Sequence, residues 1–352
     1  MTRDAGCDGS HVEFLRVSAD ARDRYFDQVG FRSSTGFQMS MPTSVKQQPQ
    51  RIINPGAGFN LGNWERVAEI GRGRWFVAYR ARPRHFSAGR PADYVLKLPI
   101  EQCVSETTAD MLRREATISQ EFSHPHVQTV LEAGFTSSLS YLVLPYFPGG
   151  TWGALAGVST WRLASRCMWV FRQVAEGLLA LHKAGSIHGD LKPDNVYVAT
   201  TGHTLLIDLG MSVRRSASDK QGHKAFMGTL DYAAPEAFVA GRAVDASSDI
   251  YGLGVMLYEA LSGRLPFVFA DSHRLSKAHR CTPPLPLQRL APELPSNLVS
   301  MVMEMLAKEP CRRPHAEEVV SEMIELEVAL FGQVLQLPAG VLQSPGDTQR
   351  VA

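Results

Sequence analysis

The stretch HGDLKPDN, followed closely by LLIDLG, constrains this chain more than any other part of its sequence. It places Asp190, Asn195 and Asp208 in one short run that is expected to pass from a loop through a strand into a second loop. Mg²⁺ prefers hard oxygen ligands and is usually held by one or two carboxylates together with substrate phosphates. Asp208 and Asn195 are therefore the predicted metal ligands. Asp190 is left to accept the proton of a substrate hydroxyl, and Lys192 to neutralise charge on a phosphate in transfer.

Two weaker signals lie upstream of this cluster. Gly71 and Gly73, in EIGRGRWFVAYRA, sit between strand-like runs, where backbone N–H groups without a neighbouring Cβ can approach a phosphate closely. Lys97 ends the next strand-like run, and Glu115 lies on the helix expected after it, so that the carboxylate can hold the lysine extended. Taken singly, the glycines could simply form a turn, Lys97 could be an edge-strand lysine, and Glu115 could belong to a solvated helix face. It is the acidic cluster downstream that favours a phosphate site.

The order of the expected elements predicts an α+β fold with two lobes. Residues 64–82 and 92–99 are typical of strands, a helix is expected over MLRREATISQEF, and SSLSYLVLPYF is typical of a further strand. Later in the chain, apolar residues recur at helical intervals from Phe171 to Leu181 and from Ile250 to Leu261, and Gly263 is the expected stop of the second helix. Strands first and helices after them imply a small β-rich lobe joined to a larger helical lobe.

Both ends of the chain differ from this middle part. Residues 1–60 are rich in polar and turn-forming residues and are expected to form a largely disordered extension. Within it, Val12 to Val29 has the pattern of an amphipathic helix. Residues 335–352 are expected to form a frayed tail.

Composition and charge argue against several other classes of protein. A hydrophobic content of 44%, a charged content of 20% and a net charge of +1 are ordinary for a globular protein and give no reason to expect binding to nucleic acid. The five cysteines are far apart in the sequence, which favours free thiols in a reducing cytosol over a disulfide framework or a zinc site. The N-terminus lacks the apolar core of a secretory signal, and no apolar run is long enough to span a membrane. A cytoplasmic protein without a membrane span is predicted, and its oligomeric state is left open.

With these residues in view, the chain resembles the eukaryotic-type (Hanks-type) protein kinase family over roughly residues 64 to 330. The Gly71-x-Gly73 segment is similar to the loop that covers the phosphates in this family. Lys97 and Glu115 resemble its strand lysine and the helix carboxylate that partners it, and HPHV suits the link after that helix.

The resemblance continues through the second half of the chain. GTLDYAAPE is similar to the end of the activation segment of protein kinases, a block that small-molecule kinases usually lack. Asp249 resembles the aspartate that opens the central helix of the large lobe, and Arg313 resembles the arginine that pairs with the position of Glu236. Lys192 together with Thr229 is similar to the serine/threonine branch, and the compact catalytic unit resembles bacterial members.

The resemblance implies a bilobal protein-kinase fold, with an N-lobe at residues 64–144 and a C-lobe at 148–330. It implies transfer of the ATP γ-phosphate to Ser or Thr hydroxyls of protein substrates, with Mg²⁺, or alternatively Mn²⁺, as the metal. The catalytic residues would be Asp190, Lys192, Lys97 and Glu115, and the metal ligands Asn195 and Asp208. Beside Leu144 at the gatekeeper position, the residues that would contact ATP are Gly71, Gly73, Ala78, Val95, Lys97, Pro145 and Phe147. Pro145 would use only its carbonyl, and the N–H donor to adenine would come from Phe147.

Two departures from the family pattern concern the nucleotide site. Phe76 replaces the third glycine of the loop, which predicts a stiffer loop, with Trp75 and Phe76 capping the site against water. Over the adenine, Ala78 stands where valine is usual and Val95 where alanine is usual. One change removes methyl groups and the other adds them, so the two are expected to compensate in volume.

A third departure concerns regulation. The arginine that normally precedes the catalytic aspartate is Gly189, so the chain has the non-RD arrangement. In the family that arginine docks a phosphate of the activation loop by charge-assisted hydrogen bonds. Without it, activity is expected not to depend on phosphorylation of the candidate acceptors Ser212, Ser216, Ser218 and Thr229. Arg214 and Arg215 of the same loop would be left without a partner and could act as electrostatic substitutes.

Two other classes of function are open to a chain with this pattern. A pseudokinase would use the fold as a nucleotide-binding scaffold without chemistry, which Phe76 and Gly189 favour slightly. The complete set of catalytic and metal residues argues against it, because loss of one of them is the usual mark of an inactive kinase. A kinase for a small hydroxylated metabolite is the second alternative, and GTLDYAAPE together with Arg313 argues against that.

Overall fold

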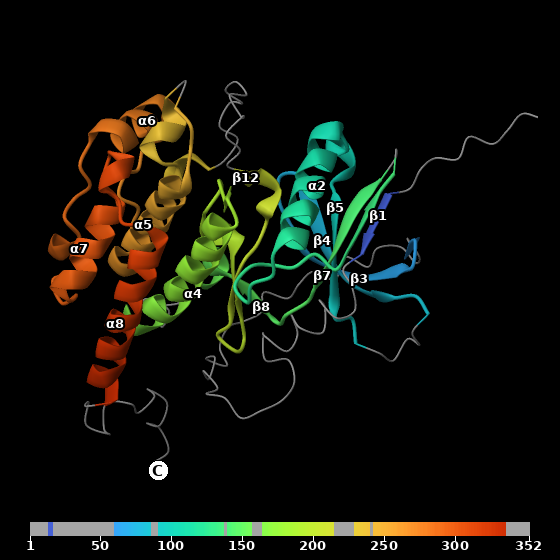
Figure 1. The fold of residues 1–352 in the computed structure, drawn as a ribbon, viewed down its shortest axis with the longest axis horizontal. Helices are drawn as coiled ribbons and strands as arrows, with labels where there is room; N and C mark the ends of the chain where they lie inside the picture. The colour runs from blue at the N-terminus through green and yellow to red at the C-terminus, as the bar shows by residue number, and fades with distance from the viewer. Residues whose placement is uncertain are drawn as a thin grey trace, which may run out of the picture.

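A computed structural model describes residues 13–16, 60–85, 91–136, 139–156, 164–214, 229–239 and 242–335 of the chain. Within this part, most strands precede the long helices. Figure 1 shows the larger sheet and helix α2 at one end of the molecule and helices α4 to α8 at the other. The predicted α+β fold with a small β-rich lobe and a larger helical lobe is confirmed.

The small lobe is built on a seven-stranded antiparallel sheet with the strand order β1-β6-β7-β5-β4-β3-β2. Its strands are β1 (Glu13–Arg16), β2 (Asn60–Leu61), β3 (Trp64–Arg72), β4 (Phe76–Pro83), β5 (Tyr94–Pro99), β6 (Glu132–Phe135) and β7 (Ser140–Pro145). The inner strand β7, rich in apolar residues, is buried along its whole length. By contrast, β3 is half-exposed toward the end that carries the glycines.

Helix α2 (Glu106–Glu121) packs against this sheet. It begins at Ser105, whose side chain accepts a hydrogen bond from the Thr108 N–H while the Thr108 hydroxyl accepts one from the Ser105 N–H. Its apolar side buries Met111, Leu112 and Ala116, which share one core cluster with residues of β4, β6 and β7. This packing fixes which side of α2 faces the other lobe, and Glu115 lies on that side.

The large lobe surrounds two buried helices, α4 (Ala164–Lys183) and α5 (Ala246–Ser262). The predicted helical spacing is confirmed, because Phe171, Val174, Leu178 and Leu181 are all fully buried. Helix α5 ends at Gly263, as predicted, and this residue adopts a left-handed backbone with φ of 78°. The remaining helices are α3 (Trp152–Leu155), α6 (Ser272–Cys281), α7 (Ser296–Met305) and α8 (Ala316–Leu335).

Two small sheets carry the functional loops of this lobe. One joins β8 (Gly149–Thr151), β10 (Val196–Ala199) and β11 (Thr204–Leu206), and the other joins β9 (Ser186–Ile187) to β12 (Val213–Arg214). The loop with HGDLKPDN runs from β9 to β10, and Asp208 follows β11 directly. The predicted loop–strand–loop order of the acidic cluster is therefore confirmed.

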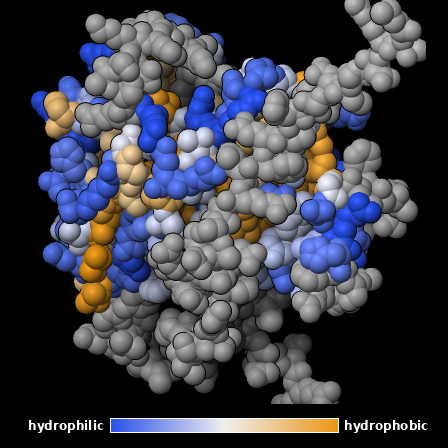
Figure 2. Space-filling view, turned by 45° about the vertical axis from the view of Figure 1, so that its right-hand side comes forward, coloured by the Kyte–Doolittle hydropathy of each residue, from blue (hydrophilic) through white to orange (hydrophobic). Residues whose placement is uncertain are grey.

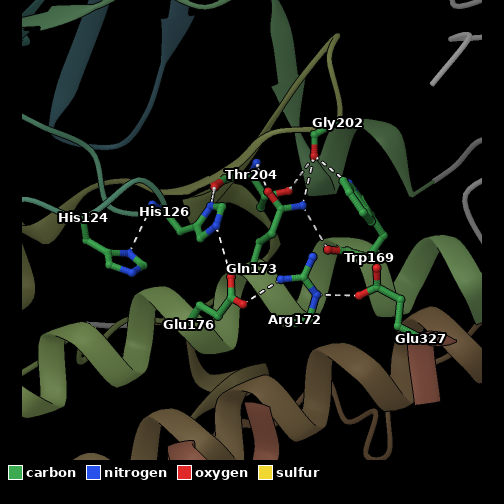
Figure 3. A network of polar contacts seen from close by, with 9 residues as sticks. All are labelled: His124, His126, Trp169, Arg172, Gln173, Glu176, Gly202, Thr204 and Glu327. Carbon is green, nitrogen blue, oxygen red and sulfur yellow. Dashed lines mark hydrogen bonds and ion pairs between the residues drawn. The ribbon is translucent and has the colours of Figure 1, made fainter. Parts of the chain in front are cut away.

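A polar network ties the segment after α2 to the large lobe (Figure 3). Nδ1 of His126 lies 2.9 Å from the Thr204 carbonyl and its Nε2 lies 3.1 Å from Glu176 on α4. The Gln173 side chain on α4 bonds the backbone of Gly202 and Thr204 between β10 and β11. Because His126 follows α2 in the chain, these contacts fix that helix relative to the loops of the large lobe.

The predicted helix from Val12 to Val29 is wrong at Glu13–Arg16, which form strand β1 and pair antiparallel with β6. Without β1, strand β6 would be the edge of the sheet, with a row of unpaired backbone N–H and C=O groups. Satisfying these groups outweighs a short helical pattern that has no neighbouring helix to pack on. Residues 17–29, the rest of that prediction, lie outside the described residues.

Hydrophilic residues cover much of the described surface on the face shown in Figure 2, with a smaller number of hydrophobic ones between them. Large hydrophobic side chains that stand well out of the described surface are few, such as Val268 and Val328. A helix of sufficient length and apolarity to cross a lipid bilayer does not occur among the described residues.

Candidate active site

Three charged side chains predicted to handle phosphates meet at one point between the lobes. Nζ of Lys97, on β5, lies 2.7 Å from Oε2 of Glu115 and 3.0 Å from Oδ1 of Asp208. The Glu115 side chain is only 2% exposed, which excludes the alternative of a solvated helix face. Burial disfavours the charged ammonium, but attraction by the Asp208 and Glu115 carboxylates outweighs it and raises the pKa of Lys97. Lys97 is therefore a permanent cation held extended by carboxylates from both lobes.

Asp208 occupies a strained backbone position. Its φ is 64°, and it is the only non-glycine residue with a positive φ in the described part of the chain. The next residue, Leu209, is buried and supplies the expected apolar plug, while the Gly210 carbonyl accepts a hydrogen bond of 2.8 Å from Arg114 on α2. Burial raises the pKa of the Asp208 carboxyl, but the Lys97 cation outweighs this and leaves that pKa lowered. Asp208 is thus an ionised carboxylate that faces the Lys97 ammonium.

The second part of the site is the loop around Asp190. Nζ of Lys192 donates to Oδ2 of Asp190 at 2.6 Å, and the Thr229 N–H donates to Oδ1 at 3.3 Å. Nδ2 of Asn195 donates to the Asp190 carbonyl at 2.8 Å and to its Oδ2 at 3.2 Å. With its NH₂ group engaged in this way, Asn195 keeps its Oδ1 as an acceptor for a cation. Asp190, Lys192 and Asn195 are brought together as predicted.

A buried aspartate at the start of α5 fixes the backbone of this loop. Asp249 accepts hydrogen bonds from the N–H groups of His188 at 2.8 Å and Gly189 at 2.9 Å, and it contacts His182 at 2.9 Å. Gly189 has a φ of 78°, and a Cβ at this position would lie 3.0 Å from the carbonyl oxygen of Met211. The backbone at this position therefore suits glycine. The same residue leaves the loop without the usual arginine side chain.

The two loop glycines lie where the fold itself does not demand them. Gly71 stands opposite Ala78, one residue before the end of β3, and the Gly73 N–H donates to the Phe76 carbonyl in the turn to β4. A Cβ at Gly71 would meet nothing within 4 Å, and one at Gly73 would meet only the Phe76 carbonyl oxygen at 3.7 Å. Neither has a positive φ, so the open space above them is the feature that glycine preserves.

Phe76 packs inward, which revises the prediction that it caps the site. Its side chain is buried in the cluster of α2 and the central strands, and its ring centroid lies 5.0 Å from Nζ of Lys97. The ring is thus a wall behind the lysine and a member of the core. Trp75 is partly buried against the same cluster.

The residues predicted to hold adenine line the junction between β4, β5 and β7; they are Ala78, Val95, Leu144, Pro145 and Phe147. Ala78 stands opposite Lys97 in the sheet, and Val95 stands opposite Leu144. The Phe147 carbonyl accepts a hydrogen bond of 2.8 Å from the Tyr197 hydroxyl, which fixes the crossing between the lobes. Direct contact of these residues with a nucleotide, and the compensation between Ala78 and Val95, stay predictions.

The predicted pairing of Arg313 with Glu236 is confirmed. The guanidinium donates to both carboxylate oxygens, at 2.7 and 2.8 Å, and the two side chains are 0% and 3% exposed. Arg313 also donates to the backbone carbonyls of Ser247 and Ala307. The end of the activation segment is thereby joined to α5 and to the loop before α8.

The expectation that Arg214 would lack a partner is wrong. Its guanidinium lies 2.8 Å from Oε2 of Glu121, at the end of α2. Among the candidate phosphorylation sites, Ser212 is fully buried and donates to the His188 carbonyl at 3.2 Å, so it is structural in this conformation. Arg215, Ser216 and Ser218 lie outside the described residues.

A pocket of about 380 Å³ adjoins the catalytic loop, and its lining includes Trp152, Lys192, Asp194, Thr229, Tyr232 and Glu259. The Tyr232 hydroxyl donates to the Glu259 carboxylate at 2.7 Å. Sequence reasoning missed Asp194, Tyr232 and Glu259. Asp194 and Tyr232 stand inside HGDLKPDN and GTLDYAAPE, so they were available from the motifs, but Glu259 meets them only through the packing of α5.

A family model described as the protein kinase domain matches residues 64–323. The match includes the β-rich lobe, the helical lobe and the charged side chains between them, and the chain belongs to the protein kinase family. The resemblance inferred from HGDLKPDN, LLIDLG and GTLDYAAPE is confirmed.

Among relatives, two kinases of Myxococcus xanthus are similar to this chain. Serine/threonine-protein kinase pkn2 is 35% identical over 251 residues, or 68% of this chain, and serine/threonine-protein kinase Pkn1 is 30% identical over 263 residues, or 73%. Aurora kinase A-A of Xenopus laevis is 32% identical over 229 residues, covering 64% of this chain and 54% of that protein. The matches span only 30% and 37% of the two Myxococcus kinases. These names agree with the predicted serine/threonine branch and with the expected similarity to bacterial members.

Proposed function

We propose that this chain transfers the γ-phosphate of ATP to Ser or Thr hydroxyls of protein substrates in a Mg²⁺-dependent reaction. One observation carries the proposal: Nζ of Lys97 lies 2.7 Å from the Glu115 carboxylate and 3.0 Å from the Asp208 carboxylate. It is supported by a second group on the loop from β9 to β10, where Lys192 lies 2.6 Å from Asp190, and this loop is joined to the residue before Asp208 by the hydrogen bond from the Ile207 N–H to the Asn195 carbonyl.

Each group has a separate part in the reaction. Lys97, held by Glu115, would bind the α- and β-phosphates, while Asp190 would orient the substrate hydroxyl and accept its proton as the oxygen–phosphorus bond forms. The bond between the γ-phosphorus and the bridging oxygen breaks and ADP leaves. Lys192, 2.6 Å from Asp190, would offset the negative charge of the phosphoryl group in transfer. Catalysis would come mainly from positioning and charge, since protein groups form no covalent bond.

Asp208 and Asn195 fit a divalent cation. Among the residues that the structure describes, no group of three or more His, Cys, Asp or Glu side chains converges to hold an ion. An ion bound by Asp208 and Asn195 would therefore need phosphate oxygens and water to complete its ligands, which is the usual mode for Mg²⁺. When bound, it supplies positive charge to the phosphates.

A labelled-ATP assay separates this proposal from its rivals. The protein is incubated with MgCl₂, labelled ATP and a generic basic protein substrate, beside an Asp190→Asn variant. We expect label on the protein substrate with the parent and none with the Asp190→Asn variant. Nucleotide binding without label would support the pseudokinase alternative, and label on a small hydroxylated compound but not on protein would support the metabolite kinase.

We further propose that activity does not require phosphorylation of the activation segment. The residue before Asp190 is Gly189, which has no side chain to dock a phosphate, and Ser212 is buried. Enzyme carrying Ser216→Ala and Ser218→Ala, like the phosphatase-treated parent, is expected to keep the turnover of the untreated parent, measured as initial rates at saturating ATP. Loss of turnover in the double variant, rescued by Ser216→Glu or Ser218→Glu, would contradict this proposal.

The substrate side of the site is proposed to favour a basic residue near the phosphoacceptor. The pocket beside Lys192 and Thr229 contains the carboxylates of Asp194 and Glu259, whereas its Lys192 ammonium is already paired with Asp190. Burial and the neighbouring Glu259 raise the pKa of Tyr232, so this phenol stays neutral and its hydroxyl donates to the Glu259 side chain. The pocket therefore carries net negative charge and suits a guanidinium or ammonium group.

Matched peptides test this preference. Replacing an Arg near the acceptor Ser by Ala is expected to raise KM about tenfold with the parent enzyme, the effect of one charge-assisted contact. With Asp194→Lys, a peptide carrying Glu in place of that Arg is expected to become the better substrate. Equal KM values for the Arg and Ala peptides at every position within four residues of the Ser would refute the preference.

A further inference from the structure

The first residues after Asp208 are tied down at three points. The Gly210 carbonyl accepts from Arg114 at 2.8 Å, the Ser212 hydroxyl donates to the His188 carbonyl at 3.2 Å, and Arg214 reaches Glu121 at 2.8 Å. Arg114 and Glu121 both belong to α2, the helix that also carries Glu115. The start of the activation segment is thus joined to α2 at both ends of its described length.

Glu121, the partner of Arg214, lies at a position on α2 where a negative charge is unfavourable. Glu121 is the last residue of α2, where the helix dipole disfavours negative charge, and the last turn of α2 contains no basic residue. Arg214, on β12, supplies the missing positive charge from another element, 2.8 Å from the Glu121 carboxylate. With the segment in this position, the negative charge at the end of α2 is therefore offset by a cation.

This arrangement has the opposite polarity to a phosphate clamp. In a clamp, the mobile segment carries the anion and the catalytic loop carries the cation. Here the segment carries the cation, Arg214, the helix carries the anion, Glu121, and the loop position that would hold an arginine is Gly189. A charge contact between segment and helix is consequently present without any phosphate.

We propose that Arg214 is a positioning residue for phosphoryl transfer: its ion pair with Glu121 holds the start of the activation segment against α2 in the arrangement in which Glu115 reaches Lys97. The inference rests on the proposed kinase function and adds to it the means by which an unphosphorylated segment is kept in place. Because neither side chain touches the substrates in this role, the pair affects kcat through the placement of Glu115 and Asp208.

The expected size of the effect on kcat follows from the solvent exposure of the two side chains. The Arg214 and Glu121 side chains are 60% and 28% exposed, so solvent screens the pair and its loss alters rate modestly. Arg214→Glu, which puts two carboxylates together, is expected to lower kcat about three- to tenfold at low salt, with a smaller loss for Arg214→Met. The exchanged pair, Arg214→Glu with Glu121→Arg, is expected to recover kcat to within about twofold of the parent.

The experiment measures kcat and the KM values for ATP and for a peptide substrate in the full chain, together with the midpoint of thermal unfolding and hydrogen exchange of residues 115–121. In Arg214→Glu, kcat is expected to fall and exchange at the end of α2 to rise, while KM for the peptide and the unfolding midpoint stay near those of the parent. Lys183→Glu is the control, because Lys183 is about as exposed as Arg214, at 63% against 60%, and forms an ion pair with Glu317 at 3.4 Å that involves neither α2 nor the activation segment.

Three outcomes decide the proposal. Loss of kcat in Arg214→Glu that the exchanged pair restores supports it. An unchanged kcat, or a loss that the exchange does not restore, overturns it while leaving the kinase function intact. Absence of Asp190-dependent label in the parent protein overturns the kinase function itself, and the role of Arg214 falls with it.

Discussion

Replacing Lys97 by methionine is expected to lower kcat by on the order of 10³-fold or more. The methionine keeps most of the length and the apolar stem, so the change removes chiefly the ammonium that lies 2.7 Å from Glu115 and 3.0 Å from Asp208. Without that cation, the α- and β-phosphates lose their partner, and two neighbouring carboxylates repel each other where Asp208 must bind metal. The measurement is kcat with saturating MgATP, with Lys183→Met as the exposed control.

The same variant has a predicted effect on stability that can be separated from catalysis. Removing Lys97 alone leaves the Glu115 carboxylate buried without a cation, which destabilises the fold or forces protonation of Glu115. Adding Glu115→Leu to Lys97→Met is expected to recover the unfolding midpoint without recovering turnover. Turnover within tenfold of the parent in Lys97→Met would instead show that another group binds the phosphates.

Replacing Arg313 by methionine is expected to lower the free energy of unfolding by about 3–5 kcal/mol. Arg313 and Glu236 form a buried two-pronged pair, and the change leaves the Glu236 carboxylate without its cation. The backbone carbonyls of Ser247 and Ala307 lose their donor as well. Urea unfolding at neutral pH measures the loss. The neighbouring Arg312→Met is the matched control, because Arg312 is 74% exposed and its change is expected to cost less than about 0.5 kcal/mol.

The pH dependence of unfolding gives this prediction a definite sign. Burial raises the pKa of Glu236, but hydrogen bonds and attraction from Arg313 outweigh it and leave that pKa lowered in the folded protein. A group with a lowered folded pKa contributes its stability above its unfolded pKa, near 4.5, and loses it as the pH falls through the folded value. The parent should therefore lose the contribution of the pair under acid. In Arg313→Met this part of the acid dependence should be absent, and an acid profile equal to that of the parent would contradict the role given to the pair.

The sequence allowed the chemistry of the site to be predicted better than its surroundings. Lys97, Glu115, Asp190, Lys192, Asn195 and Asp208 were predicted because phosphoryl transfer requires particular side chains at fixed spacings, and those spacings are visible in one chain. Their partners depend on which elements meet in space. Arg214 and Glu121 lie far apart in the sequence and meet because β12 pairs with β9, and Glu259 joins Asp194 through the packing of α5.

The fold shows the same division between local and long-range information. Helices α4 and α5 were predicted because their buried residues recur at helical intervals. Strand β1 was predicted as helix because its pairing partner, β6, is more than 100 residues away, and no local pattern reveals an open sheet edge. Phe76 was taken for a cap over the site because its place in a glycine loop does not disclose that the ring turns toward α2.

The placement of β1 bears on how this protein should be truncated. Strands β1 and β2 lie at opposite edges of the seven-stranded sheet, so the chain between Arg16 and Asn60 has to pass from one edge to the other, a distance of roughly 30 Å at the usual strand spacing. A shortened protein that starts at Trp64, where the family match begins, would leave β6 with an open row of backbone donors and acceptors. Such an edge invites pairing between copies, and self-association of the shortened protein could then be mistaken for a natural dimer. Any oligomer found with a truncated form therefore needs to be reproduced with the chain that includes Glu13–Arg16.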